Sequence, residues 1–103
     1  MGEYLGEFEH LILLAIARLG EEAHGVTIRQ MLKDRAGRRA SFGAIYSTVR
    51  RLEDKGLVRS QLGESTPVRG GRARKQLTLT PRGRAAMLTT QRAFRVMATG
   101  IDA

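Results

Sequence analysis

The side chains that could do chemistry in this chain are mostly cations, and they are densest in one short segment. That segment, VRGGRARK at residues 68–75, holds four cations and two adjacent glycines. Arginine and lysine donate hydrogen bonds to anionic oxygens, and paired glycines let a backbone turn sharply. Taken alone, the segment fits a solvated linker, a phosphate-cradling loop or a surface for a polyanion. It is not a nucleotide-binding P-loop, because the Gly-Lys-Ser/Thr ending is absent.

Patterns typical of catalysis or metal binding are missing from the sequence. His10 and His24 have no second ligand three or four residues away and no hydrolase-like serine or aspartate nearby. The chain has no cysteine, which excludes disulfides and thiolate metal sites. We therefore expect no enzyme activity, no cofactor and no metal, with structural or surface roles for both histidines.

The net charge of +8 is unevenly distributed along the chain. Residues 1–34 carry a formal charge of −3, and residues 35–103 carry +11. A basic region of this size attracts polyanions, chiefly nucleic acid, although it would also serve as a solvated surface that aids solubility. The most apolar run, residues 11–17, is too short to cross a bilayer, and no secretion signal precedes it. We expect a cytoplasmic protein with no membrane partner.

Apolar periodicity and capping signals predict the first three elements. Helical spacing predicts a helix over about residues 7–19, closed by Gly20, and a second helix over about residues 26–35. A third helix follows Ser41, a good N-cap, and runs to about residue 55. Three consecutive helices therefore precede the basic segment.

The second half of the chain changes period after Gly56. Short apolar alternation on both sides of a glycine-rich stretch is typical of a β-hairpin. Thr80 as N-cap and Pro81 at the first helical position begin a last helix that runs to about residue 99. The expected fold class is mainly α with a small β-hairpin.

The third predicted helix has a polar face suited to a DNA groove. On a helical wheel, one side is apolar, with Tyr46 at its flank: Phe42, Ile45, Val49 and Leu52. The opposite side is small, hydroxylated or cationic: Gly43, Ala44, Ser47, Thr48, Arg50 and Arg51. Small residues allow close approach to base edges, and hydroxyls and arginines bond to bases or phosphates. An ordinary amphipathic helix with a solvated face would show the same pattern.

The helices before this one and the basic hairpin after it favour a winged helix-turn-helix. In such a domain the second helix of the pair, here the third predicted helix of the chain, enters the major groove. We expect such a DNA-binding domain over residues 1–80, followed by one C-terminal dimerisation helix over residues 81–103 in the same compact unit. The hairpin tip then lies beside DNA phosphates. The predicted wing contacts are Arg69, Arg72, Arg74 and Lys75.

Two helices carry apolar residues that suggest a second subunit. The first predicted helix is apolar on nearly all sides, a pattern typical of a helix buried on more than one side. In the last helix, Met87, Phe94 and Ile101 are spaced by seven, with Met97 near them. The predicted dimer contacts are Leu11, Leu14, Met87, Phe94 and Met97.

Three segments resemble the PadR family of transcriptional regulators, and together they cover about residues 5–88. They read LGEFEHLILLAIARLGEEAHGVTIRQML, SFGAIYSTVRRLEDKGLVRSQLGE and RGGRARKQLTLTPRGRAAM. The combination of Gly43–Tyr46, the RLExxGL pattern at residues 51–57 and the LTPxG pattern at residues 79–83 is the most specific part. The LTPxG pattern alone is common to several winged-helix families.

The resemblance implies a homodimeric winged helix, usually a repressor, that binds an inverted-repeat operator. Tyr46 resembles the family's recognition-helix tyrosine, often close to the DNA backbone. By position, the resemblance also implies DNA contacts by Ser41, Gly43, Ser47 and Arg50 of the third helix and by Arg72, Arg74 and Lys75 of the wing.

The chain departs from the family pattern in two respects. Many relatives continue into a longer C-terminal domain, whereas a single helix follows Pro81 here, as in the short subfamily. In that subfamily the helix is expected to pack against the partner's first helix. Some short members also hold a flat aromatic drug between paired tryptophans. This chain has no tryptophan, and Phe94 is the one aromatic residue of its last helix. A small hydrophobic or aromatic effector therefore stays open.

From the sequence we predict a sequence-specific regulator that binds double-stranded DNA, acting as a homodimeric repressor of an inverted-repeat operator. One alternative is a winged helix that binds nucleic acid without sequence preference. Another is a protein-interaction winged helix whose third helix meets an acidic partner. The full set of predicted DNA contacts is Ser41, Gly43, Tyr46, Ser47, Arg50, Arg51, Arg69, Arg72, Arg74 and Lys75.

Overall fold

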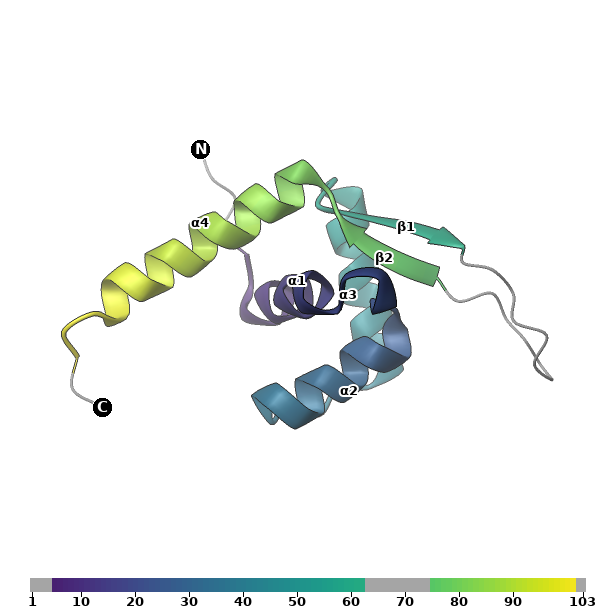
Figure 1. Cartoon of the computed structure of the whole chain (residues 1–103), viewed down its shortest axis with the longest axis horizontal. Coiled ribbons are helices and arrows are strands. Elements are labelled where there is room, and N and C mark those ends of the chain that lie inside the picture. Colours follow the sequence, from purple (N-terminus) through teal and green to yellow (C-terminus); the bar gives the residue numbers. More distant parts are fainter. Residues whose placement is uncertain (1–4, 63–74, 102–103) are drawn as a thin grey trace.

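The computed structural model describes residues 5–62 and 75–101, and its elements follow the predicted order (Figure 1). Three helices and a short 3₁₀ turn come first, then an antiparallel hairpin, then a long helix. Their bounds are α1 Glu7–Leu19, η1 Gly20–Glu22, α2 Gly25–Ala36, α3 Phe42–Asp54, β1 Val58–Leu62, β2 Lys75–Leu79 and α4 Pro81–Ala98. The expected mainly helical fold with a small β-hairpin is confirmed, and η1 is the element that the sequence pattern missed.

The core forms around α1, which contacts α2, α3, α4 and β2. Ile12 and Leu13 are both fully buried, although they point to different sides of the helix. The apolar character on nearly all sides of α1 therefore arises largely from its position among the chain's own elements. Leu11 and Leu14 are the partly buried exceptions, and they pack at the edge of the core.

The hairpin is attached to the helical part of the chain through Leu77. Its strands pair in the register Val58 with Leu79 and Ser60 with Leu77. The Leu77 side chain is buried in the core, and its amide donates a 2.8 Å hydrogen bond to the Ala23 carbonyl in the connection between α1 and α2. The base of the wing is thus fixed beside the beginning of α2.

The start of α4 explains the LTPxG pattern physically. The Thr80 hydroxyl caps the helix by accepting from the Gly83 amide at 2.9 Å and donates to the Gly56 carbonyl at 2.7 Å. The Thr80 amide donates to the Leu57 carbonyl at 3.1 Å. A Cβ atom at Gly83 would collide with that same Leu57 carbonyl. The pattern therefore fixes the direction in which α4 leaves the hairpin.

The second half of α4 extends away from the rest of the molecule (Figure 1). Met87 and Thr90 are buried, but every described residue from Gln91 onward is exposed. Met87 belongs to the core of its own chain, where it is 5% exposed, and its contact with a second subunit stays a prediction. Phe94 and Met97 continue the same side of the helix beyond the core and remain exposed. No helix in the described part of the chain is long and apolar enough to span a membrane.

Candidate nucleic-acid interface

The outward side of α3 presents Gly43, Ser47 and Arg50. These three residues are exposed, and they lie opposite the buried side of the helix formed by Ile45, Thr48, Val49 and Leu52. Small residues therefore occupy its first turns and an arginine its middle. The structure brings these predicted DNA-contacting residues together on one surface.

Thr48 was expected on the polar face, but it is buried. It lies three residues after Ile45 and four before Leu52, so it shares their side of the helix. Its hydroxyl accepts a hydrogen bond from the Arg51 guanidinium at 3.2 Å, which satisfies the polar atom. Thr48 is thus a structural residue, and the polar face of α3 is narrower than the sequence suggests.

Arg51 points to a different side of α3 from the outward residues. Its Nε lies 3.9 Å from a carboxylate oxygen of Glu9, and the Nζ of Lys55 lies 3.0 Å from the same oxygen. Glu9 also accepts from the Gly6 amide at 3.0 Å. Burial alone would raise the pKa of Glu9, but the Gly6 amide, Lys55 and Arg51 outweigh it and hold that pKa below its ordinary value. This ionised cluster joins α3 to the first turn of α1.

Ser41 and the first turn of α3 have a structural role that the sequence did predict. The Ser41 hydroxyl accepts from the Ala44 amide at 3.1 Å and so caps the helix. The Ser47 hydroxyl donates to the Ala44 carbonyl at 3.2 Å, which leaves its oxygen exposed on the outward side. The cap fixes where the outward surface begins.

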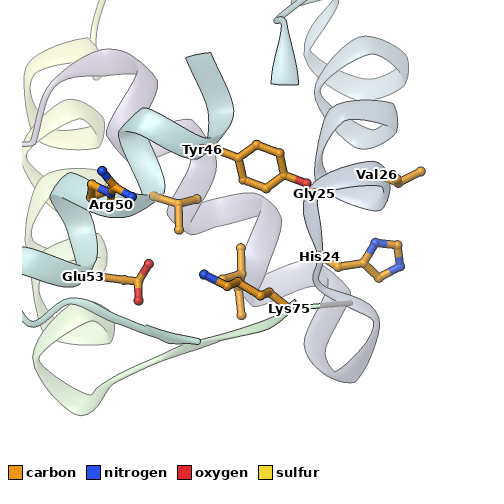
Figure 2. Close-up of a pocket in the computed structure, with 9 residues that line it drawn as sticks. His24, Gly25, Val26, Tyr46, Arg50, Glu53 and Lys75 are labelled. Atoms are coloured by element: carbon orange, nitrogen blue, oxygen red, sulfur yellow. The ribbon is translucent and has the colours of Figure 1, made fainter. Parts of the chain in front are cut away.

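An aromatic and cationic stack fixes α3 against α2. The Phe42 and Tyr46 rings stack with centroids 6.2 Å apart, and the Arg29 guanidinium lies 4.7 Å from the Phe42 centroid. The Tyr46 hydroxyl abuts Gly25 at the start of α2, where any Cβ atom would collide with it (Figure 2). Phe42 was expected on the buried side, but its residue is 38% exposed, because the Arg29 and Tyr46 side chains cover its ring only in part. The role of Arg29 could not be predicted from the sequence, because it depends on the packing of α2 against α3.

A cleft of about 440 Å³ separates the start of α2 from α3 and β2 (Figure 2). Arg50 of α3 and Lys75 of β2 both line it, so the outward side of α3 and the wing share one basic surface. Glu53, also at the cleft, accepts a hydrogen bond from Ser60 of β1 at 2.8 Å. The other predicted wing contacts, Arg69, Arg72 and Arg74, lie outside the described residues. Among the described residues, no three acidic or histidine side chains gather where a metal ion could bind.

Comparison with known proteins agrees with this arrangement. The model of the transcriptional regulator PadR-like family matches residues 12–89. A transcriptional regulator of Mycobacterium tuberculosis is 42% identical over 77 residues, which are 75% of this chain and 67% of the relative. The crystal structure of a PadR-like transcription factor from Bacteroides fragilis superposes with a TM-score of 0.72 at 27% identity, covering 87% of this chain and 82% of that one.

The winged-helix DNA-binding protein F93 from STIV shares the fold over a larger part of both molecules. It superposes with a TM-score of 0.74 at 21% identity and covers 97% of this chain and 100% of that one. With a family match over most of its length and a curated relative above 40% identity, the chain belongs to the transcriptional regulator PadR-like family.

Proposed function

We propose that this protein is a sequence-specific DNA-binding repressor that acts as a homodimer on an inverted-repeat operator in the cytoplasm. The observation that carries the proposal is the outward side of α3, where Gly43, Ser47 and Arg50 are exposed together. Arg50 also shares a cleft with Lys75 of the wing. These residues have no carboxylate partner within the described part of the chain. They are therefore available to a polyanion.

In the proposed complex α3 lies in the major groove. The absence of a side chain at Gly43 lets the helix backbone approach the base edges, and Ser47 offers a hydroxyl to a base or a phosphate. Arg50 reaches a guanine edge or the backbone. The wing adds affinity that does not depend on the DNA sequence, because its cations attract phosphates. These cations are Lys75 and the predicted contacts Arg69, Arg72 and Arg74.

In the proposed dimer, the projecting part of α4 meets α1 of the partner. Phe94 and Met97 are 63% and 76% exposed, although they continue the buried side of α4. Leu11 and Leu14 of α1, with Met31 of α2, line a small open cleft of about 120 Å³ that offers an apolar surface to them. Two-fold symmetry would then place the two α3 helices about 34–36 Å apart, one turn of DNA. A small hydrophobic or aromatic effector would act by changing this separation.

The test is binding to the region upstream of the protein's own gene compared with random duplex. Specific binding exceeds non-specific binding by about 10³–10⁷-fold in typical regulators. We expect a protected inverted repeat in footprinting, and we expect Arg50→Ala to weaken binding to that repeat by about 5–150-fold, the equivalent of about 1–3 kcal/mol.

The alternatives predict different results. Equal affinity for the upstream region and random duplex would indicate a nucleic-acid binder without sequence preference. Unchanged duplex binding and salt dependence in both Arg50→Ala and Arg72→Ala would instead indicate a surface for an acidic protein.

A further inference from the structure

A second basic cleft lies outside the surface described above, between α2 and the segment that leads into α3. It measures about 150 Å³ and is lined by Arg29, Gln30, Lys33, Arg39 and Ala40. Three of these five residues are cations, and two of them come from α2. None of the three belongs to the DNA contacts predicted from the sequence.

The charges in this cleft are not neutralised by the chain itself. Within residues 5–62 and 75–101, no ion pair involves Arg29, Lys33 or Arg39. The nearest acidic residue along α2, Asp34, accepts two hydrogen bonds from the Gln30 amide at 2.9 and 3.0 Å. Like charges four residues apart on a helix, such as Arg29 and Lys33, repel each other and destabilise the helix. A bound anion would remove that repulsion.

Arg29 is held in position before any ligand arrives. Its Nε donates to the Ala40 carbonyl at 3.1 Å, and its guanidinium lies over the Phe42 ring. The Nη atoms make no hydrogen bond to the described residues, so they remain available as donors. A pre-oriented guanidinium binds phosphate oxygens at a smaller entropic cost than a freely rotating one.

The place of the cleft in the fold indicates which anion it binds. In a helix-turn-helix, the first helix of the pair crosses the DNA backbone while the start of the second helix contacts bases. The cleft joins these two parts, because α2 forms one wall and the residue before the Ser41 cap forms the other. The start of α3 also carries the positive end of its helix dipole, which favours an anion nearby.

We propose that Arg29, Lys33 and Arg39 bind one phosphate diester of the DNA backbone beside the start of α3. The proposal rests on the DNA-binding function proposed above. Such a contact would hold α3 in register in the major groove and add affinity without reading the sequence. Its effect should therefore be equal on operator and on random duplex.

The experiment measures affinity for the operator and for random duplex over a series of salt concentrations. The variants are Lys33→Gln and Arg39→Gln, which remove charge without touching the Arg29–Phe42 stack. The control is Arg84→Gln, which removes an exposed cation near the start of α4. In Figure 1 the start of α4 lies on the opposite side of α1 from α2. Circular dichroism melting confirms that each variant folds.

We expect each cleft variant to weaken binding to both duplexes by a similar factor of about tenfold, as for the loss of a charged hydrogen bond. The slope of log affinity against log salt should fall in magnitude by about 0.9, the value for one phosphate. The Arg84→Gln control should keep the wild-type slope. A duplex with a neutral methylphosphonate at the contacted position should weaken binding by the wild type, and it should weaken binding by Lys33→Gln by a smaller factor, because Arg29 and Arg39 remain.

Wild-type affinity and slope in both cleft variants would overturn the proposal, and a concurrent loss of operator binding in Arg50→Ala would show that the proposed function stands without it. Conversely, equal wild-type affinity for operator and random duplex would overturn sequence-specific function, while a reduced slope in Lys33→Gln would still support the phosphate site. Chemical shifts of the Arg29, Lys33 and Arg39 amides that saturate with inorganic phosphate but do not move with duplex would assign the cleft to a free anion and overturn the proposal.

Discussion

Gly83 lies where the first turn of α4 passes against the backbone of Leu57. A Cβ atom there would collide with the Leu57 carbonyl, which is itself held by the Thr80 amide. We expect Gly83→Ala to lower the free energy of unfolding by about 3 kcal/mol, because backbone cannot move aside as a side chain can. Urea unfolding measures this. Wild-type stability in Gly83→Ala would show that α4 can shift without cost.

Gly43 is the matched opposite case on α3. A Cβ atom there would meet only the Ser41 hydroxyl, at 3.9 Å, which is ordinary contact. Because alanine favours a helix over glycine, we expect Gly43→Ala to raise the free energy of unfolding by up to about 1 kcal/mol. The added methyl group would stand on the outward side of α3 and keep the backbone from the base edges.

The Gly43→Ala variant should therefore be more stable and bind its operator less tightly, by about tenfold. Melting temperature and operator affinity measured on the same sample check both parts. Unchanged operator affinity with raised stability would mean that α3 does not approach the bases at this position.

The histidines show how little single residues reveal without their surroundings. His10 stacks on Phe94 with ring centroids 6.2 Å apart, and its Nδ1 has no hydrogen-bond partner among the described residues. Burial holds the pKa of His10 below its ordinary value, which favours the neutral ring. Its role is structural at the junction of α1 and α4.

The family consists of transcriptional regulators, which confirms the expectation that the chain is not an enzyme.

Among the elements, the boundaries of α3 and α4 could be predicted because their signals are local. Ser41 and Thr80 cap their helices through residues three positions later, and Pro81 suits the first helical position. The burial of Thr48 and the exposure of Phe42 could not be predicted, because burial depends on which other elements cover the helix. The role of Arg29 could not be predicted for the same reason, because its partners lie in α3 and in the segment that precedes α3.

Glu9 connects α1 to α3 and should make the fold sensitive to acid. The Glu9 residue is 7% exposed, and its carboxylate is paired with Lys55 and Arg51. Because the pKa of Glu9 is lowered in the folded state, its contribution to stability is complete above the unfolded pKa of 4.5. That contribution is lost as the pH falls through the folded value.

We expect Glu9→Gln to lower the free energy of unfolding at neutral pH by about 1–3 kcal/mol and to flatten its dependence on pH below about 4.5. Glu21→Gln, at an exposed residue of η1 without a described partner, is the control and should leave both unchanged. Unfolding curves at a series of pH values test this. An acid dependence in Glu9→Gln equal to that of the wild type would place the sensitive group elsewhere.

At the scale of the whole molecule, a single chain leaves apolar residues of α4 exposed. The core lies around α1, but α4 continues beyond it with an apolar side that the described elements leave largely exposed, apart from the stack of Phe94 on His10 (Figure 1). The sequence predicted apolar residues at this place, but spacing alone does not show that Met87 belongs to the core of its own chain. Phe94 and Met97 are the residues left exposed by that geometry.

The proposed dimer predicts that the two sides of α4 respond differently to the same change. Phe94 and Val96 are 63% and 67% exposed, yet they lie on opposite sides of the helix. Neither residue belongs to the core, so an aspartate at either place should leave the fold intact, although Phe94→Asp also removes the stack on His10. We expect Phe94→Asp to raise the dimer dissociation constant by about 30-fold or more, as for a central interface residue, and Val96→Asp to leave it near the wild-type value. Sedimentation at micromolar concentration separates these outcomes.

Operator affinity should fall with the dimer in Phe94→Asp, since one α3 helix reads only half of an inverted repeat. A wild-type protein that sediments as a monomer, or two variants that behave alike, would contradict the α4 interface.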